Sequence, residues 1–299
     1  MVGIFLSVVL PVFLVIAIGF LLGRVKVIHR ESLSSLCLHV LTPSLIFHSL
    51  TTQTLTGPVA VGVVLFSIAH FAAMTLLVLL VLKIAPLAAE MRRPVLLSSI
   101  LLNAGNYGLP VVLFAFGELG LSVGILFFIA INILTSTVGV YVAAGKDSTA
   151  VGALKSTLKI PWFYVIIAAI VVRVGGFSLP IWLAKSVELT AQAAIPVALL
   201  LLGIQLSRTP LRGYLPVASL VSSFRLLVAP ALGLGLAYLL SLPAEVAPIL
   251  VVQCSMPTAV FAVILSIEFD VRPEIVSSAI LISTALSVPS LTALIWLVT

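Results

Sequence analysis

Long apolar runs cover almost the whole chain, and they restrict its possible folds more than any other feature. Ten segments approach the roughly 20 residues that a helix needs to span a bilayer. Charged residues make up only 8% of the 299 residues, too few to cover the surface of a soluble protein of this size. We therefore expect an all-α integral membrane protein of ten transmembrane helices. The segments are 3–23, 32–52, 58–83, 94–117, 119–145, 160–178, 180–206, 214–241, 245–267 and 274–298.

The composition also argues against several functional classes. The net charge of +6 does not indicate nucleic-acid binding, because basic residues in membrane proteins mainly mark cytoplasmic loops. No nucleotide-binding Gly-rich loop with Lys, zinc-ligand spacing or nucleophile motif occurs, so we expect no enzyme, no cofactor and no metal. Cys37 and Cys254 lie within apolar runs and are interpreted as small buried hydrophobes.

The basic residues alternate between loops in a way that predicts the orientation. Twelve of the fifteen Lys and Arg residues fall in the odd-numbered loops, whereas only Arg173 and Lys185 fall in the even-numbered ones. The odd-numbered loops are therefore predicted to be cytoplasmic, with both termini outside the cell inner (plasma) membrane. Basic residues follow the first apolar run, which favours an uncleaved first helix over a signal peptide.

The two halves of the chain resemble one another. Residues 1–150 contain the first five segments and residues 151–299 the other five, with Pro43 matched by Pro196 and Pro110 matched by Pro257. Because five is odd, the second half enters the membrane with opposite polarity. Inverted repeats of this kind are typical of transporters that work by alternating access.

The fourth and ninth segments are predicted to be broken near mid-membrane. Pro110 clashes with the carbonyl of Asn106, and Pro257 frees the carbonyl of Gln253. Broken helices supply partial charges from their freed ends, and polar backbone at this depth must line a cavity or pack inside protein. We interpret the paired breaks as a substrate site; the alternative is a pair of kinks satisfied by neighbouring helices.

Two ionisable side chains lie deep within spans. Arg225, in the eighth segment, has no acidic partner within any span, so it either meets an anionic substrate or caps freed carbonyls. His70, in the third segment, either relays protons or is hydrogen-bonded in a polar pocket. His39, His48 and Gln205 are weaker candidates.

The remaining candidates are polar or helix-breaking residues in the fourth, fifth and ninth segments. Asn132 begins a polar stripe in the fifth segment that continues through Thr135, Ser136 and Thr137. The full set of predicted substrate-binding residues is Asn103, Asn106, Tyr107, Pro110, Asn132, Gln253, Ser255, Pro257, Thr258, Arg225 and His70.

The sequence resembles the auxin efflux carrier family of bacteria and archaea over its whole length. Three stretches carry the resemblance, and the Asn-x-Gly-Asn-x-Gly-x-Pro pattern in the first is fairly specific. They are Asn103–Pro110, Leu41–Phe47 and Arg225–Pro230.

The resemblance implies a crossover of broken segments four and nine, in a fold shared with sodium–bile acid symporters. It implies a scaffold domain of segments 1, 2, 6 and 7, a moving transport domain of segments 3–5 and 8–10, and a homodimer through the scaffold. Relatives are linked to small carboxylates or to auxin. The symporters place an acidic residue at their sodium site, where this chain has Gln253, Ser255 and Thr258.

We therefore expect a secondary transporter for a small organic anion. A channel-like pore, a sodium-coupled symporter of the bile-acid type and a membrane-embedded sensor or structural subunit remain alternatives. Membrane lipid is the other expected partner, and coupling to protons or sodium is left open.

Overall fold

The computed structural model describes residues 1–52, 55–145, 161–209 and 214–299. Its described residues form helices and connecting loops, with no strand longer than one isolated bridge. The predicted polar connection 145–159 lies outside this description except for Gly145. The main helices are α2 (Leu10–Val25), α3 (Arg30–Leu36), α4 (Thr42–Thr52), α5 (Gly57–Ile84), α6 (Ala89–Ile100), α7 (Leu109–Leu134), α8 (Val140–Ala144), α10 (Pro161–Val174), α11 (Ile181–Ser207), α12 (Leu215–Ser223), α13 (Ala229–Leu239), α14 (Ala247–Cys254), α15 (Phe261–Glu268) and α16 (Pro273–Val298).

Wide, π-helical turns join several of these helices into longer rods. The turns at Phe5–Val9, Cys37–Leu41, Ala104–Gly108 and Phe224–Val228 each end two residues before a proline. A proline has no N–H and its ring crowds the carbonyl four residues earlier, so a widened turn lets the rod continue past it.

The all-helical membrane class is confirmed. Seven helical rods among the described residues are long and apolar enough to cross a membrane, which makes the chain a multi-pass membrane protein. The predicted number of ten remains a prediction. One rod, 104–144, covers parts of two predicted segments. Its helix is kinked at Gly117, which has the non-helical angles φ 64° and ψ −151°, close to the predicted boundary between those segments.

Two predicted spans are interrupted, which explains part of the difference in number. The fourth segment breaks after α6 at Leu101–Asn103, and the ninth breaks between α14 and α15. The prediction that Pro110 marks the first break was wrong, because the break at 101–103 lies before the helical rod begins, and the rod passes Pro110 through the wide turn Ala104–Gly108. The widened turn makes room for the proline ring and takes up the helical hydrogen bond that Pro110 cannot donate, so the rod continues.

The two breaks lie against one another. The N–H of Asn103 donates to the carbonyl of Pro257 at 2.9 Å, and that of Ala259 donates to the carbonyl of Leu101 at 2.9 Å. Leu102 and Thr258 thus form an antiparallel bridge. Each unwound strand satisfies the backbone of the other, as an unwound segment at membrane depth requires.

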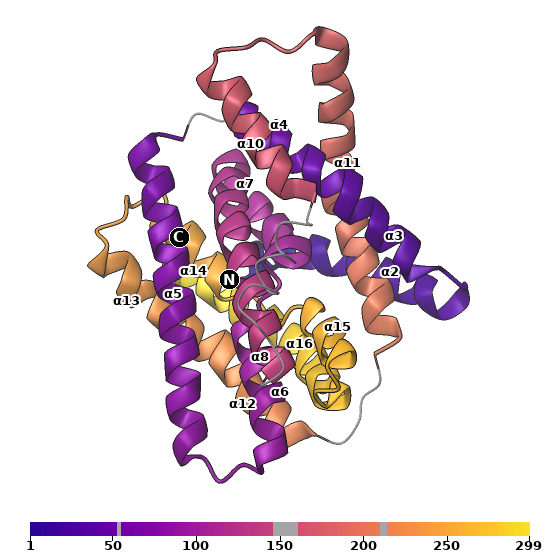
Figure 1. Ribbon diagram of the computed structural model, residues 1–299, viewed down its shortest axis with the longest axis vertical. Coiled ribbons are helices and arrows are strands. Elements are labelled where there is room, and N and C mark those ends of the chain that lie inside the picture. The colour runs from indigo at the N-terminus through magenta and orange to yellow at the C-terminus, as the bar shows by residue number, and fades with distance from the viewer. Residues whose placement is uncertain (53–54, 146–160, 210–213) are drawn as a thin grey trace.

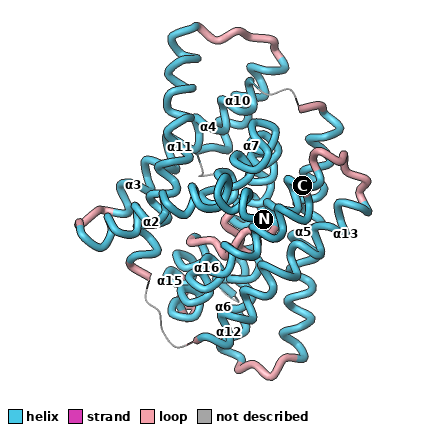
Figure 2. The backbone as a smooth tube through the Cα atoms, turned by 180° about the vertical axis from the view of Figure 1, so that it is seen from behind, coloured by secondary structure: helices cyan, strands magenta, loops and turns pink. Residues whose placement is uncertain are grey.

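The helices pack as two groups. In one group, α2 and α4 pack on α11 and α10 packs on α4; in the other, α5, α6, α7 and α12–α16 surround the crossed breaks. Figure 1 shows α4, α10 and α11 towards the upper right and α5, α12 and α13 towards the lower left, and Figure 2 shows the same division from behind.

The first group is held by an unusually close contact between α2 and α11. A Cβ atom at Gly19 would lie 2.3 Å from the carbonyl oxygen of Leu200, and one at Gly203 would lie 2.0 Å from that of Ile16. Glycine at both positions lets the two backbones meet, which is how small residues drive helix association in membranes.

Candidate functional site

A cavity of about 410 Å³ lies beside the crossed breaks. Five parts of the chain form its wall: the start of the second segment, the first break, the end of α7 with the turn after it, the end of α11 and the start of α15. The lining residues are Ser34, Cys37, Leu38, Thr42, Leu102, Asn103, Ala104, Gly105, Asn106, Phe128, Ile131, Asn132, Thr135, Ser136, Val140, Leu201, Gln205, Ala259, Val260, Phe261 and Ile264.

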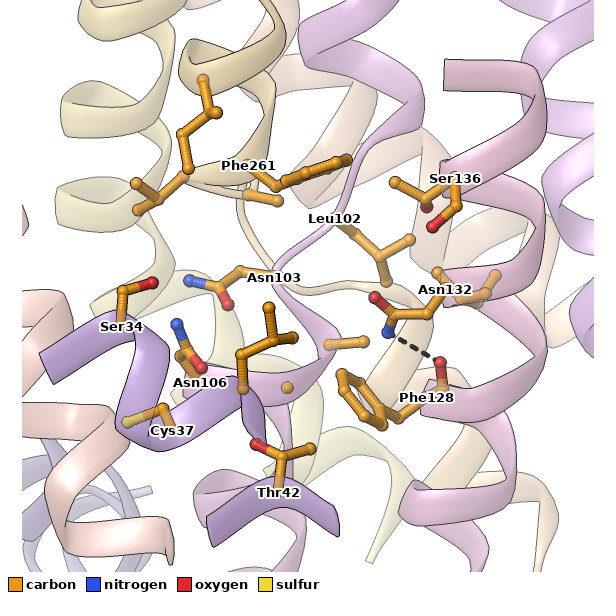
Figure 3. Close-up of a pocket in the computed structure, with 18 of the residues that line it drawn as sticks. Ser34, Cys37, Thr42, Leu102, Asn103, Asn106, Phe128, Asn132, Ser136 and Phe261 are labelled. Atoms are coloured by element: carbon orange, nitrogen blue, oxygen red, sulfur yellow. Dashed lines mark hydrogen bonds between the residues drawn. The ribbon is translucent and has the colours of Figure 1, made fainter. Parts of the chain in front are cut away.

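Three asparagine amides line this space, together with the amide of Gln205. Asn103 and Asn106 enter from the first break, and Figure 3 shows both beside Ser34. Asn132 enters from α7 and donates its Nδ2 to the carbonyl of Phe128 at 2.8 Å, which fixes the direction of its side-chain oxygen. Asparagine offers both donors and an acceptor, so the three amides can hydrogen-bond a polar group from several directions.

Most of the remaining wall is apolar and partly aromatic. Phe128 of α7 and Phe261 of α15 line the cavity, together with Leu102 and Ile264. The ring of Phe128 occupies the space beside Gly105, where a Cβ atom would lie 2.5 Å from Cε2 of that ring. The cavity therefore combines a few amides with a mostly apolar wall, as ligand pockets commonly do.

No charged side chain is among the described residues that line the cavity. Arg225 lies behind the crossed breaks and donates to the carbonyls of Cys254, Met256 and Ser99. Its side chain is 1% exposed, and a charge at this depth needs such partners. Of the two interpretations offered by the sequence, a cap on freed carbonyls fits this geometry.

Gln253 supports the first break from the second half of the chain. Its Nε2 donates to the carbonyl of Ala104 at 3.0 Å, and its Oε1 has no partner among the described residues. The side chain lies against Gly108, where a Cβ atom would be 2.6 Å from Oε1. Gln253 is fully buried and does not line the cavity.

Most other predicted residues also bond inside the protein. The hydroxyl of Tyr107 hydrogen-bonds that of Ser287 at 2.9 Å, and that of Thr258 donates to the carbonyl of Ser98 at 2.9 Å. Ser255, just after α14, donates its hydroxyl to the carbonyl of Val251, and His70 bonds the carbonyl of Ala229 through Nε2 at 3.0 Å. Pro110 and Pro257 are absent from the cavity wall.

In the second segment the sequence analysis named only His39 and His48, as weaker candidates, and neither lines the cavity, although other residues of that segment do. Ser34, Leu38 and Thr42 recur every four residues and so share one helix face. That spacing, with two hydroxyls on a face otherwise suited to lipid, is a signal that the sequence did contain. Phe261 and Leu102 carried no such signal, because an apolar residue in an apolar segment does not reveal what it contacts.

The charged groups outside the spans that the structure describes are absent from the cavity wall. Arg272, in the turn before α16, pairs with Glu90 at the start of α6 and with Glu274. Glu90, and then Glu274, raise the pKa of Arg272 above its usual value, so this guanidinium stays charged. The pair joins the two halves of the chain beyond the crossed breaks.

A multi-pass helical protein in which two interrupted helices meet beside a partly polar cavity has the architecture of a membrane transport protein. The family model described as membrane transport protein matches the chain twice, over residues 4–152 and 148–295. The chain therefore belongs to this family, the auxin efflux carriers, and contains two repeats of the family unit.

Three proteins similar to this chain carry transporter names. An uncharacterized transporter of Methanocaldococcus jannaschii is 28% identical over 94% of this chain and 95% of its own length. A second, of Methanothermobacter thermautotrophicus, is 28% identical over 95% of both chains. A Rhizobium meliloti protein named "Putative malonate transporter" is 32% identical over 66% of this chain and 64% of its own length.

Proposed function

We propose that this protein is a secondary transporter that binds a small organic anion in the cavity beside the crossed breaks. The observation that carries the proposal is the pair of helix beginnings at the cavity wall. Residues 103–106 precede and begin the helical rod of α7, and residues 259–261 precede and begin α15; both stretches line the cavity. Helix N-termini carry partial positive charge and unpaired N–H groups, which favour an anionic group.

The two helix groups supply the means for alternating access. A cluster of apolar side chains, including Leu45 and Ala194 from the first group and Leu109 and Ile125 from α7, fills the seam between them. Apolar contacts have no fixed direction, so such a seam tolerates sliding better than a hydrogen-bonded one. The first group corresponds to the expected scaffold and the second to the expected transport domain.

The two breaks are tied together within the second group. Their mutual hydrogen bonds and those of Arg225 and Gln253 all join segments of that group. The cavity wall formed by the breaks would therefore move as one piece, carrying its contents past the α4–α11 side of the cavity.

The cavity extends towards the side predicted to be cytoplasmic. Its wall reaches Ser34 near the start of α3, Gln205 near the end of α11 and Ile264 in α15. Each of these helix ends adjoins one of the odd-numbered loops, which are predicted to be cytoplasmic from the overall distribution of Lys and Arg. We assign the described conformation as the cytoplasm-facing one.

The anion is proposed to be a carboxylate. The Rhizobium meliloti relative is named for malonate, and the amides of Asn103, Asn106 and Asn132 suit the oxygens of a carboxylate. The apolar body formed around Phe128 and Phe261 would hold the carbon skeleton.

The decisive experiment is counterflow in proteoliposomes. Purified protein is screened by thermal stabilisation against a panel of mono- and dicarboxylates, and the best ligand is loaded on one side. We expect saturable exchange of labelled ligand with no measurable unitary current. Continuous current that does not saturate would establish the channel alternative instead.

The expected homodimer belongs to the same proposal, with α2, α4, α10 and α11 as the contacting group. Mass measurement of the protein in lipid nanodiscs tests it. A mass equal to one chain at all protein concentrations would contradict the dimer without affecting the transport proposal.

A further inference from the structure

We propose that Arg225 makes the cavity attractive to anions without touching its contents, by neutralising the negative ends of the two half-helices behind the crossed breaks. This inference rests on the proposed function only in assuming that an anion is the natural occupant. Arg225 would be a positioning residue, because it would act on the ligand only through the helix ends that it contacts. Its own contacts are entirely with the main chain.

The contacts of Arg225 fall at the carboxyl ends of α6 and α14. Nη2 donates to the carbonyls of Cys254 at 2.6 Å and Met256 at 2.9 Å, and Nε donates to Met256 at 3.0 Å. Nη1 donates to the carbonyl of Ser99 at 3.3 Å. Because α14 ends at Cys254 and α6 at Ile100, these carbonyls belong to the last turns and the residues just beyond them.

The negative and positive helix ends at the crossed breaks are not neutralised to the same extent. A helix end carries at most about half an elementary charge, negative at the carboxyl end and positive at the amino end. The single positive charge of Arg225 therefore roughly offsets the two negative ends that it contacts. The two positive ends, which begin at residues 104 and 261 beside the cavity, are left without an equivalent neutralising group among the described lining residues.

The position of Asn103 points independently to an occupant of the cavity. Its side chain is 94% buried, since only 6% is exposed, and it faces the cavity between the two breaks. Its main-chain N–H donates to the carbonyl of Pro257, while its side-chain amide makes no hydrogen bond with the described residues around it. A buried amide normally has partners, so a polar ligand or water is expected beside it.

The burial of Arg225 strengthens its effect across the breaks. The side chain is 1% exposed, and its hydrogen-bond partners are all neutral carbonyl groups. In a medium of low dielectric constant, an unscreened charge acts over a longer distance than it does in water. Removing this charge would leave the negative ends of α6 and α14 exposed to the back of the cavity.

The test measures the potential in the cavity with charged thiol reagents and needs no known substrate. Ser34 lines the cavity and Ser32, on the same helix, is exposed and lies outside it. Each is changed to Cys in a Cys37→Ser background; Cys254 stays, because it is 0% exposed. The rates of an anionic sulfonatoethyl and a cationic trimethylammonioethyl methanethiosulfonate are compared in zwitterionic nanodiscs.

We expect the anionic-to-cationic rate ratio to be about tenfold higher at Ser34→Cys than at Ser32→Cys. Adding Arg225→Gln should bring the two ratios within about twofold, whereas Arg225→Lys, which keeps the charge, should preserve most of the difference. A purely structural role would change the rates of both reagents together and leave their ratio unaltered.

Three results would overturn the inference: equal ratios at the two positions in the unaltered protein, an unchanged ratio in Arg225→Gln, or an equal loss in Arg225→Lys. The first applies even if Arg225→Gln fails to fold. Because no substrate enters the measurement, failure of the transport proposal leaves this result intact.

Discussion

Asn103 and Pro257 meet through one main-chain hydrogen bond of 2.9 Å, although 154 positions of sequence number separate them, from 103 to 257. The bond uses the backbone of Asn103 and leaves its side chain free to face the cavity. It thereby joins the two repeats at the point where both spans lose their helical hydrogen bonds. Asn103 therefore contributes both to the contact between the repeats and to the wall of the candidate site.

The close approach of α2 and α11 makes a prediction about stability. Gly19→Ala would place a methyl group 2.3 Å from the carbonyl oxygen of Leu200, so the helices must separate. We expect a loss of about 1–3 kcal/mol, seen as a lower melting temperature in detergent.

Gly235→Ala provides the matched control. Gly235 lies within α13, and a Cβ atom there would meet nothing within 4 Å. Alanine favours the helix by up to about 1 kcal/mol over glycine, so this variant should melt at the same or a higher temperature. Equal melting temperatures for the two variants would contradict the tight contact.

Gly105 and Phe128 predict a change in cavity size. In Gly105→Ala the new methyl group would lie 2.5 Å from Cε2 of Phe128, so the ring must turn, and the open side is the cavity. We expect a folded protein whose carboxylate affinity falls about tenfold or more, measured by calorimetry on the best ligand of the panel.

A second substitution checks the mechanism. Phe128→Leu removes the ring edge, so the double variant Gly105→Ala with Phe128→Leu should regain much of the affinity. If the double variant binds as weakly as Gly105→Ala alone, the loss arises from the backbone of the break rather than from the displaced ring.

The orientation is tested by labelling in intact cells. Cysteines introduced at Thr56 and Ala244, both exposed and in even-numbered loops, should react with an impermeant maleimide from outside. A cysteine at Ala88, exposed and in an odd-numbered loop, should react only after the membrane is opened. The opposite pattern would reverse the assignment of the cytoplasm-facing state.

The positions of the spans could be predicted from the sequence because lipid imposes a long apolar run on each of them. The expected segments 58–83 and 274–298 differ by one residue at each end or less from α5 and α16. The position of the first break was harder to predict from the sequence. A proline predicts a break within a helix, but the wide turn Ala104–Gly108 carries the helix past Pro110, and the break lies earlier, at 101–103.

The candidate site was partly predictable for a related reason. A polar residue within an apolar span needs a partner, but the sequence does not reveal whether that partner is a cavity or a carbonyl of another helix. Asn132 lines the cavity, whereas Thr258 and Arg225 bond to carbonyls of α6 or the second break. Those carbonyls lie far away in sequence, so only the fold brings the groups together. The binding roles of all three remain predictions.

Gln253 tests whether the geometry of the break matters for binding. Gln253→Leu keeps the volume but removes the hydrogen bond to the carbonyl of Ala104, leaving that buried group without this donor. We expect a loss of about 1–3 kcal/mol in stability and a weaker affinity, although Gln253 does not line the cavity. Unchanged affinity in this variant would show that the break holds its shape without Gln253.

Asn103 gives the most direct test of an anion at the crossed breaks. Its side chain is free of the bond that joins the repeats, so Asn103→Ala and Asn103→Asp should both fold. Alanine removes the amide and should weaken carboxylate binding about tenfold, in line with the loss of one hydrogen bond to a charged group. Aspartate keeps the shape but places a negative charge beside the two helix beginnings, where it would occupy the same favourable potential as the ligand. It should therefore reduce affinity considerably more than alanine does, and affinity should partly return as the pH falls and the aspartate is protonated. The measurement is carboxylate binding between pH 4.5 and 8 for both variants and the unaltered protein, each checked for melting temperature at every pH. Equal affinities of Asn103→Asp and Asn103→Ala across that range would place the anionic group elsewhere in the cavity.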